Sequence, residues 1–261
     1  MIDMYNKDYL NEKSKVNIEI LDEIDSTNEE AKRRILAGAC NDFVILARKQ
    51  TAGKGRKGRS FYSPKDTGIY FTFVHFTDDS SETVLKVTVA ASVIAANAIK
   101  DALNIDCKIK WVNDLYFNNK KVSGTLCELI LKDTMNNSHN AVIVGTGINL
   151  CTEDFPDELS GIAGSLKEKI ANPGSIDDIV IGYANGLYDF FETNDLKPLM
   201  PLYKESSLVI GKEVELSDAS GFLDKGIVTD FDEEGAMIIR NLLGEIKRFD
   251  SGEISLIIDG E

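Results

Sequence analysis

The segment 42–76 constrains the fold of this 261-residue chain more than any other part. It contains two strongly apolar stretches, DFVILARKQ (42–50) and GIYFTFVHF (68–76). The second stretch alternates with the period of two that is typical of a sheet strand. Between them lies RKQTAGKGRKGRS (48–60), with six Lys or Arg and three Gly in thirteen positions. The segment therefore predicts two sheet strands that hold a basic loop at both of its ends.

The rest of the first 150 residues supplies further strands and helices. Residues 17–24 and 141–150 are predicted as strands, and 26–38 and 81–103 as helices. CKIKWVNDLYF and KKVSGTLCELILK flank the turn Asn118-Asn119 and predict a hairpin, with KWVNDLYF inside one strand. Because the strands come partly as hairpins, the expected class is α+β, with a mixed sheet packed with helices.

The pattern changes twice after residue 150. From about 160 to 206 it is helical, interrupted by Gly and by Pro173, Pro198 and Pro201. Five short strands separated by Gly and Asp turns then predict a small, closed, SH3-like β-barrel. We therefore expect two domains, 1–206 and 207–261.

Composition limits the class of protein. The chain has no run of the ~20 apolar residues that a membrane span needs, and its start is too polar for a signal peptide. The four cysteines show no CxxC spacing and the two histidines lie far apart, so neither a protein-bound metal nor a disulfide framework is expected. The net charge of −14 disfavours long-range attraction to nucleic acid. These features predict a soluble cytoplasmic protein.

The basic loop has three readings on its residues alone. Gly53, Gly55 and Gly58 let backbone N–H groups approach an anion, and Arg56 and Arg59 offer forked donors for phosphate or carboxylate. A pocket for a small anion, a nucleic-acid contact and a solvated loop all fit this composition. The loop contains no GxxxxGK[ST] sequence and lacks the interleaved aromatic residues of a single-strand binding face.

Three other motifs carry polar groups beside predicted strands or helix ends. KWVNDLYFNNKKVSG (110–124) contains the only Trp, and either faces a pocket or forms a hairpin with a solvated Lys-Lys tip. DSTNEEAK (25–32) predicts a capping box of Ser26 and Glu29, or a ligand site at a helix N-terminus. GTGIN (145–149) is a strand-ending turn without a nucleotide fingerprint.

The order of these motifs is more specific than any one of them. DSTN, QTAGKGRKGRSFYSP, KWVNDLYFNNKKVSG, VGTGIN and a β-rich tail with SGEIS together resemble the biotin protein ligases, from about residue 18 to 258. The resemblance implies a two-step enzyme. Biotin and Mg-ATP, with Mg²⁺ accompanying the nucleotide, give biotinyl-5′-AMP, and the biotinyl group then passes to a lysine of a biotin carboxyl carrier domain of a carboxylase.

The resemblance also implies roles for individual residues toward each substrate. The biotin site is implied to contain Ser26, Thr27, Asn28, Gln50 and Gly124. The adenylate and ATP site is implied to contain Gly53, Lys54, Gly55, Arg56, Lys57, Gly58, Arg59, Phe61, Asn113, Asp114 and Asn149. The implied catalytic residues are Lys121, which reaches the reacting carboxylate and phosphate, and Arg56, which helps retain the intermediate.

The chain departs from the family pattern at a few positions. Lys54 and Lys57 stand where arginine is common, and Val112 where proline is usual. About sixteen residues precede the first core strand, too few for the helix-turn-helix domain of family members that act as repressors, so DNA binding is not expected. A lipoate or octanoate ligase, a non-catalytic biotin-sensing regulator and an RNA-binding loop are the alternatives. The sequence does not distinguish a monomer from a homodimer.

Overall fold

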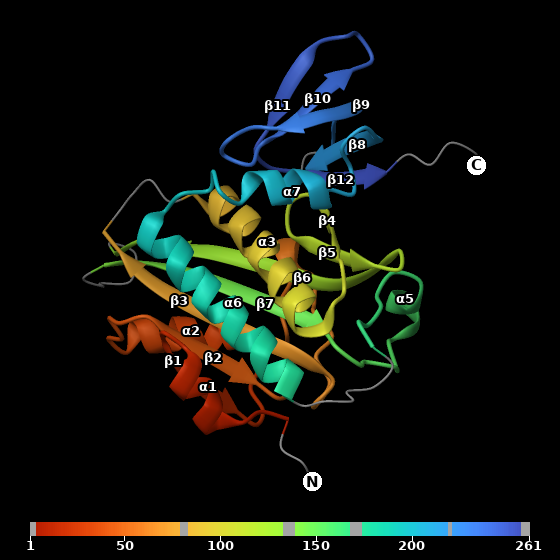
Figure 1. Ribbon diagram of the computed structural model, residues 1–261. Helices are drawn as coiled ribbons and strands as arrows, with labels where there is room; N and C mark the ends of the chain where they lie inside the picture. The colour runs from red at the N-terminus through yellow and green to blue at the C-terminus, as the bar shows by residue number, and fades with distance from the viewer. Residues whose placement is uncertain (1–3, 79–82, 133–138, 168–173, 219–220, 257–261) are drawn as a thin grey trace.

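The computed structural model describes residues 4–78, 83–132, 139–167, 174–218 and 221–256. Within these ranges a seven-stranded sheet has the order β1-β2-β3-β7-β6-β5-β4 (Figure 1). Its strands are β1 (Asn17–Leu21), β2 (Phe43–Ala47), β3 (Gly68–Thr77), β4 (Lys108–Lys110), β5 (Asp114–Phe117), β6 (Lys120–Ile130) and β7 (Asn140–Asn149). β1 and β2 are parallel and the other neighbours are antiparallel, which confirms the predicted mixed sheet.

Helices cover both faces of this sheet. The helices are α1 (Lys7–Lys13), α2 (Thr27–Leu36), α3 (Val84–Leu103), α5 (Asp157–Ser160), α6 (Gly174–Thr193) and α7 (Met200–Ser206). Because side chains alternate along a strand, Val44 and Leu46 join the core beneath α3 and α6, whereas Ile45 packs with Ala31 and Ile35 of α2. The long α3 and α6 lie side by side across one face (Figure 1).

Two local predictions are corrected by tertiary contacts. Ser26 is the N-cap residue of α2, but its side chain makes no capping hydrogen bond, and Glu29 pairs with lysines instead. The predicted strand KWVNDLYF is interrupted by a turn between β4 and β5. Buried tertiary bonds hold this turn: Trp111 Nε1 donates to Gly235 O at 3.1 Å, and Val112 O accepts from Ser92 Oγ at 3.1 Å.

The C-terminal segment forms a second, antiparallel sheet in the order β11-β10-β9-β8-β12. Its strands are β8 (Glu213–Asp218), β9 (Gly221–Phe231), β10 (Met237–Asn241), β11 (Ile246–Phe249) and β12 (Glu253–Leu256). Over the described residues no pairing joins β11 to β12, so an open sheet replaces the predicted closed barrel. The two edge strands are only four residues long, which leaves little backbone for closing hydrogen bonds. The start of the predicted helix 81–103 and the end of the stretch 18–258 that carries the resemblance lie outside the described residues.

The two sheets share one apolar core. Buried side chains of the small sheet, such as Val214 and Ile239, belong to the same cluster as those beneath α3. At the junction the rings of Tyr203 and Phe231 pack nearly perpendicular, with centroids 5.0 Å apart. The small sheet is therefore packed against the large one through buried side chains, and is not joined to it by the chain connection alone. A domain boundary near residue 206 stays a prediction. Among the described helices, none is long and apolar enough to cross a membrane.

Candidate active site

Two adjoining cavities are lined by residues of β6, β7 and the basic loop. The larger has a volume of about 530 Å³ and the smaller about 20 Å³. Four residues line both cavities: Lys54, Phe61, Gly124 and Leu126. The Phe61 ring lies against Gly147 of β7 so closely that a β-carbon there would overlap it. Phe61 therefore stands at the boundary between the two cavities.

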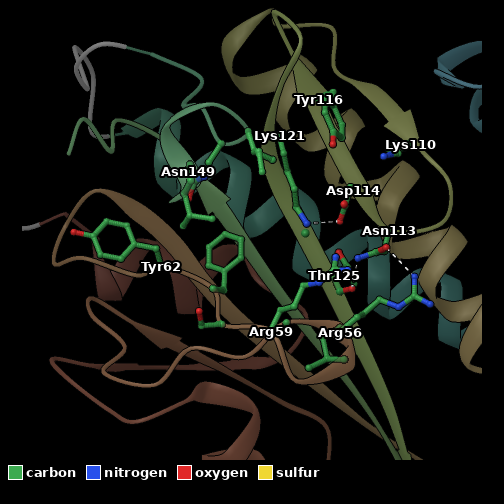
Figure 2. Close-up of a pocket in the computed structure, with 18 of the residues that line it drawn as sticks. Arg56, Arg59, Tyr62, Lys110, Asn113, Asp114, Tyr116, Lys121, Thr125 and Asn149 are labelled. Atoms are coloured by element: carbon green, nitrogen blue, oxygen red, sulfur yellow. Dashed lines mark hydrogen bonds and ion pairs between the residues drawn. The ribbon is translucent and has the colours of Figure 1, made fainter. Parts of the chain in front are cut away.

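The Lys121–Asp114 ion pair occupies the wall of the larger cavity. Lys121 Nζ on β6 lies 2.7 Å from Asp114 Oδ1 at the start of β5, and their side chains are 31% and 22% exposed (Figure 2). A β-carbon at Gly124 would lie 3.2 Å from Lys121 Nζ and 3.4 Å from Asp114 Oδ1. Glycine at 124 therefore leaves the two charged groups room beside the cavity.

The basic loop is an ordered hairpin over this wall. Gly55 N donates to Arg59 O at 2.7 Å and Phe61 N donates to Gly53 O at 2.8 Å. A β-carbon at Gly53 would lie 2.5 Å from Phe61 O, so this close approach requires glycine. At the tip, Lys57 and Gly58 have φ of 54° and 75°, the left-handed region that closes the turn.

Arg56 connects the hairpin to Asn113, which directly precedes β5. Its Nη1 donates to Asn113 Oδ1 at 3.0 Å, and Asn113 Nδ2 donates to Thr125 O at 3.0 Å (Figure 2). The two sequence motifs that carry these residues are thus joined by a direct side-chain bond. Of the predicted loop residues, those lining the larger cavity are Lys54, Gly55, Arg56, Arg59 and Phe61. Gly53 is buried under the hairpin, and Lys57 and Gly58 are exposed at its tip.

Charge in the larger cavity is strongly one-sided. Its lining carries the cations Lys54, Arg56, Arg59, Lys110 and Lys121. Among the described lining residues, Asp114 is the single carboxylate. Across the described part of the chain, no group of three His, Cys, Asp or Glu side chains could hold a metal ion. The cavity therefore suits a polyanion.

Asn149 offers a hydrogen-bond acceptor at the end of β7. Its Nδ2 donates to Gly164 O at 3.1 Å, while its buried Oδ1 has no partner among the described residues. Because a buried polar atom without a partner is unfavourable, this oxygen suits a ligand that brings an N–H donor into the cavity.

The smaller cavity gathers neutral polar side chains. Ser26, Thr27, Asn28 and Gln50 all line it, as predicted for one shared pocket. Gln50 Oε1 accepts from Thr27 N at 2.8 Å and from Thr27 Oγ1 at 3.1 Å, and Gln50 Nε2 donates to Ser63 Oγ at 3.0 Å. This bonding fixes the Gln50 amide before any ligand binds.

Asn28 is equally constrained. It accepts from Thr72 Oγ1 at 2.7 Å and donates to Glu128 Oε2 at 3.0 Å. A β-carbon at Gly145 would collide with its side chain, so β7 needs glycine there to admit the amide. Both polar ends of Asn28 are thus already used by protein partners.

Sequence reasoning missed part of the larger cavity. The missed lining residues include Lys110, Tyr116, Tyr62, Phe155, Ser217, Gly252, Ile254 and Ser255. Burial and the Asp114 charge raise the pKa of Tyr116, which keeps its hydroxyl neutral. The signal for part of this set was present, since Lys110 begins the KWVND motif and Gly252, Ile254 and Ser255 lie in SGEIS. Their position beside the loop depends on the packing of the small sheet.

Comparison with known proteins defines the class of this fold and site. The model of the biotin/lipoate A/B protein ligase family matches residues 21–149. The bifunctional ligase/repressor BirA of Bacillus spizizenii is 32% identical over 242 residues, covering 90% of this chain and 72% of that protein. The biotin--[acetyl-CoA-carboxylase] ligase of Paracoccus denitrificans is 28% identical, covering 84% of this chain and 92% of that protein.

Solved structures agree with the sequence comparisons. The biotin protein ligase of Aquifex aeolicus, solved in complex with biotin and ATP, superposes with a TM-score of 0.75 at 30% identity. The match covers 92% of this chain and 98% of that chain. The chain therefore belongs to the biotin protein ligases, within the biotin/lipoate A/B protein ligase family.

Proposed function

We propose that this protein activates biotin with ATP to biotinyl-5′-AMP and transfers the biotinyl group to a lysine of a biotin carboxyl carrier domain. The observation that carries the proposal is the junction of two chemically different cavities at Phe61 and Gly124, with Lys121 beside it in the wall of the larger cavity. A cavity lined by five cations adjoins one whose lining is mostly uncharged and hydrogen-bonding, with Lys54 shared between them, which is the arrangement needed to bring a polyphosphate to the carboxylate of a neutral head group. The Aquifex relative bound to biotin and ATP supports this assignment.

The first step joins two anions. A biotin carboxylate oxygen attacks the α-phosphorus, the new O–P bond forms, and the bond to the β-phosphate oxygen breaks to release pyrophosphate. In this proposal Lys121 would contact both the carboxylate and the α-phosphate, and Arg56 and Arg59 would contact the phosphates. Positioned cations favour this step because negative charge develops on the leaving group in a site that excludes water.

The remaining residues act by positioning. We propose that Ser26, Thr27 and Gln50 hydrogen-bond the ureido head group, with Asn28 supporting the same pocket. The Asn149 Oδ1 acceptor suits the amino group of adenine. Phe61, at the boundary of the cavities, would close over the acyl-phosphate linkage and so separate it from water.

Mg²⁺ would enter bound to the triphosphate. Mg²⁺ favours oxygen ligands and commonly uses one or two carboxylates together with substrate phosphates. Asp114 is the single carboxylate among the described residues of the cavity lining and pairs with Lys121 through Oδ1, so it would hold a metal carried by the nucleotide rather than form a dedicated protein site.

The second step is acyl transfer. A neutral lysine amine of the carrier domain attacks the acyl carbon, a C–N bond forms, the C–O bond to AMP breaks, and the amine loses a proton to solvent. The wall formed by Ser217, Gly252 and Ser255 brings residues 207–261, which we propose as a second domain, to the cavity where AMP departs.

Biotin-dependent exchange of pyrophosphate into ATP tests the first step, and covalent biotin on a carrier domain tests the second. No exchange at saturating biotin and Mg-ATP would overturn the proposal. A thermal-shift comparison of biotin with lipoate and octanoate distinguishes the related ligases, because stabilisation by lipoate alone would reassign the substrate.

A further inference from the structure

The first lysine of the basic loop forms an ion pair with helix α2. Lys54 Nζ lies 2.8 Å from Glu29 Oε1, with the side chains 48% and 29% exposed. The Lys54 backbone also bridges to Ser60 across the hairpin. Fixing the Lys54 side chain therefore fixes the base of the hairpin that carries Arg56 and Arg59.

This ion pair belongs to a longer series of alternating charges. Glu29 Oε1 lies 2.8 Å from Lys32 Nζ, and Lys32 Nζ lies 2.7 Å from Glu128 Oε1 on β6. Hydrogen bonds from Lys32 and then Lys54 lower the pKa of Glu29, so its carboxylate stays charged. Partly buried networks of this kind are screened less by solvent than an isolated surface pair.

The series ends inside the smaller cavity. Glu128 Oε2 accepts from Asn28 Nδ2 at 3.0 Å, while Thr72 Oγ1 donates to Asn28 Oδ1 at 2.7 Å. Because one partner requires the amide N–H and the other requires the amide oxygen, Asn28 has one orientation. A continuous path of side-chain contacts therefore joins the basic loop to the smaller cavity.

Lysine at position 54 suits this path of contacts better than arginine would. A compact ammonium can approach one carboxylate oxygen that another lysine already contacts, whereas a guanidinium prefers to pair with both oxygens of a carboxylate. The charge of Lys54 is engaged by protein, and Arg56, Arg59 and Lys121 supply the other cations of the larger cavity.

We propose that Glu29 and Lys54 are positioning residues, and that the series Lys54–Glu29–Lys32–Glu128–Asn28 (the ionic series) holds the basic loop in place at the junction of the two cavities. The inference rests on the proposed function, since its kinetic consequence is slower loss of the acyl adenylate. It gives Lys54 a role through Glu29 rather than through a phosphate.

The kinetic test measures the rate at which preformed biotinyl-5′-AMP leaves the protein. Glu29→Gln and Lys54→Gln should each raise this rate about threefold, the size expected for a partly exposed pair, and the double variant should match the single ones. Lys54→Arg, which keeps the charge, should recover part of the retention. High salt should raise the wild-type rate by a larger factor than it raises the rates of the variants, because the variants lack the ion pair that salt screens.

A substrate-free measurement keeps the inference separate from the proposed function. Hydrogen exchange at the hydrogen-bonded amides of Gly55 and Phe61 should be faster in Glu29→Gln than in wild type. The control is Glu30→Gln on the same helical turn, because Glu30 pairs with Arg33 and Arg34 rather than with the loop. Its exchange should equal that of wild type.

Three results would overturn the ionic series. One is a hydrogen-exchange rate at Gly55 and Phe61 in Glu29→Gln that equals the wild-type rate. This result would rule out the ionic series even if the protein proves inactive as a ligase. Another is a strong effect of Lys54→Gln with none for Glu29→Gln, since Lys54 would then act on a phosphate. The third is additivity of the two single variants. Absence of pyrophosphate exchange in wild type would count against the proposed function alone.

Discussion

The two cavities differ in how their walls are made. The smaller one is lined by short polar side chains that are already hydrogen-bonded to one another, as in the contacts of Gln50 with Thr27 and Ser63. The larger one is lined by long cationic side chains from the loop and the β4–β6 region, and the small sheet adds the uncharged residues Ser217, Gly252, Ile254 and Ser255. Preformed bonding suits recognition of one rigid head group, whereas long charged side chains can follow charge as it moves during a reaction. The comparison predicts that substitutions in the larger cavity affect rate and those in the smaller affect binding.

The largest expected effect is at Lys121. Lys121→Ala should lower the rate of biotin-dependent pyrophosphate exchange about 10²–10³-fold, because it removes a positioned cation from the developing charge. Biotin affinity, measured by calorimetry, should change little. Equal losses of rate and biotin affinity would contradict the prediction that the larger cavity determines rate and the smaller one determines biotin binding.

The neighbouring lysine provides a matched control. Lys120 Nζ donates to Ser160 O and Gly161 O at the end of α5 and does not line either cavity. Lys120→Ala should therefore retain the exchange rate of wild type to within about twofold, since exposed contacts of this kind contribute little.

A smaller effect is expected at Gly145 in the other cavity. In Gly145→Ala the new methyl group would displace the Asn28 amide, and strain of this kind should weaken biotin binding about tenfold. Calorimetric titration with biotin measures the change. Gly161→Ala is the control, because a β-carbon there meets nothing within 4 Å. Unchanged biotin affinity in Gly145→Ala would remove Asn28 from the binding site.

The contribution of the small sheet to nucleotide binding can be tested by substituting Trp111, the only tryptophan of the chain. Trp111→Phe removes the donor to Gly235 O and some buried volume, and should lower the free energy of unfolding by about 2 kcal/mol in urea titrations. Because the small sheet forms one wall of the larger cavity, KM for ATP should rise about threefold while biotin affinity stays constant. Tyr203→Phe is the control, since its hydroxyl reaches Val112 O only at 3.4 Å. An equal rise in KM for biotin would contradict the assignment of this wall to the nucleotide.

The smallest expected effect is on the pKa of Asp25, which lies just before helix α2. A hydrogen bond from Arg33 lowers the pKa of Asp25 from 3.8 to about 2. The stabilisation from this contact is therefore complete above pH 3.8 and is lost as the pH falls toward 2. In Arg33→Gln the pKa of Asp25, followed by NMR titration, should rise toward its ordinary value. No rise would mean that the Ser26 N–H, which donates to Asp25 at 2.8 Å, controls the carboxylate.

Local patterns predicted most of the large sheet, whereas the site residues came from the family resemblance and their roles stay predictions. The strongly apolar stretch 42–50 and the alternating stretch 68–76 gave β2 and β3, and the predicted site residues other than Gly53, Lys57 and Gly58 line at least one of the two cavities. The same local reasoning placed Trp111 and Val112 in a strand, although buried bonds from Trp111 to Gly235 and from Ser92 to Val112 hold them in a turn. It also assigned Ser26 and Glu29 to a capping box, although Glu29 pairs with Lys32 and Lys54.

The sequence by itself determined which residue types could meet a phosphate and a neutral head group, because charge, donor geometry and glycine are properties of single residues. Only the tertiary structure decided which of these groups face one another. Arg56 meets Asn113 across fifty-seven positions, and the small sheet closes a cavity that begins in the large one. Contacts so distant along the chain depend on packing of the common core, which no local pattern specifies. The same packing turned Lys54 toward Glu29, a partner that the composition of the basic loop did not reveal.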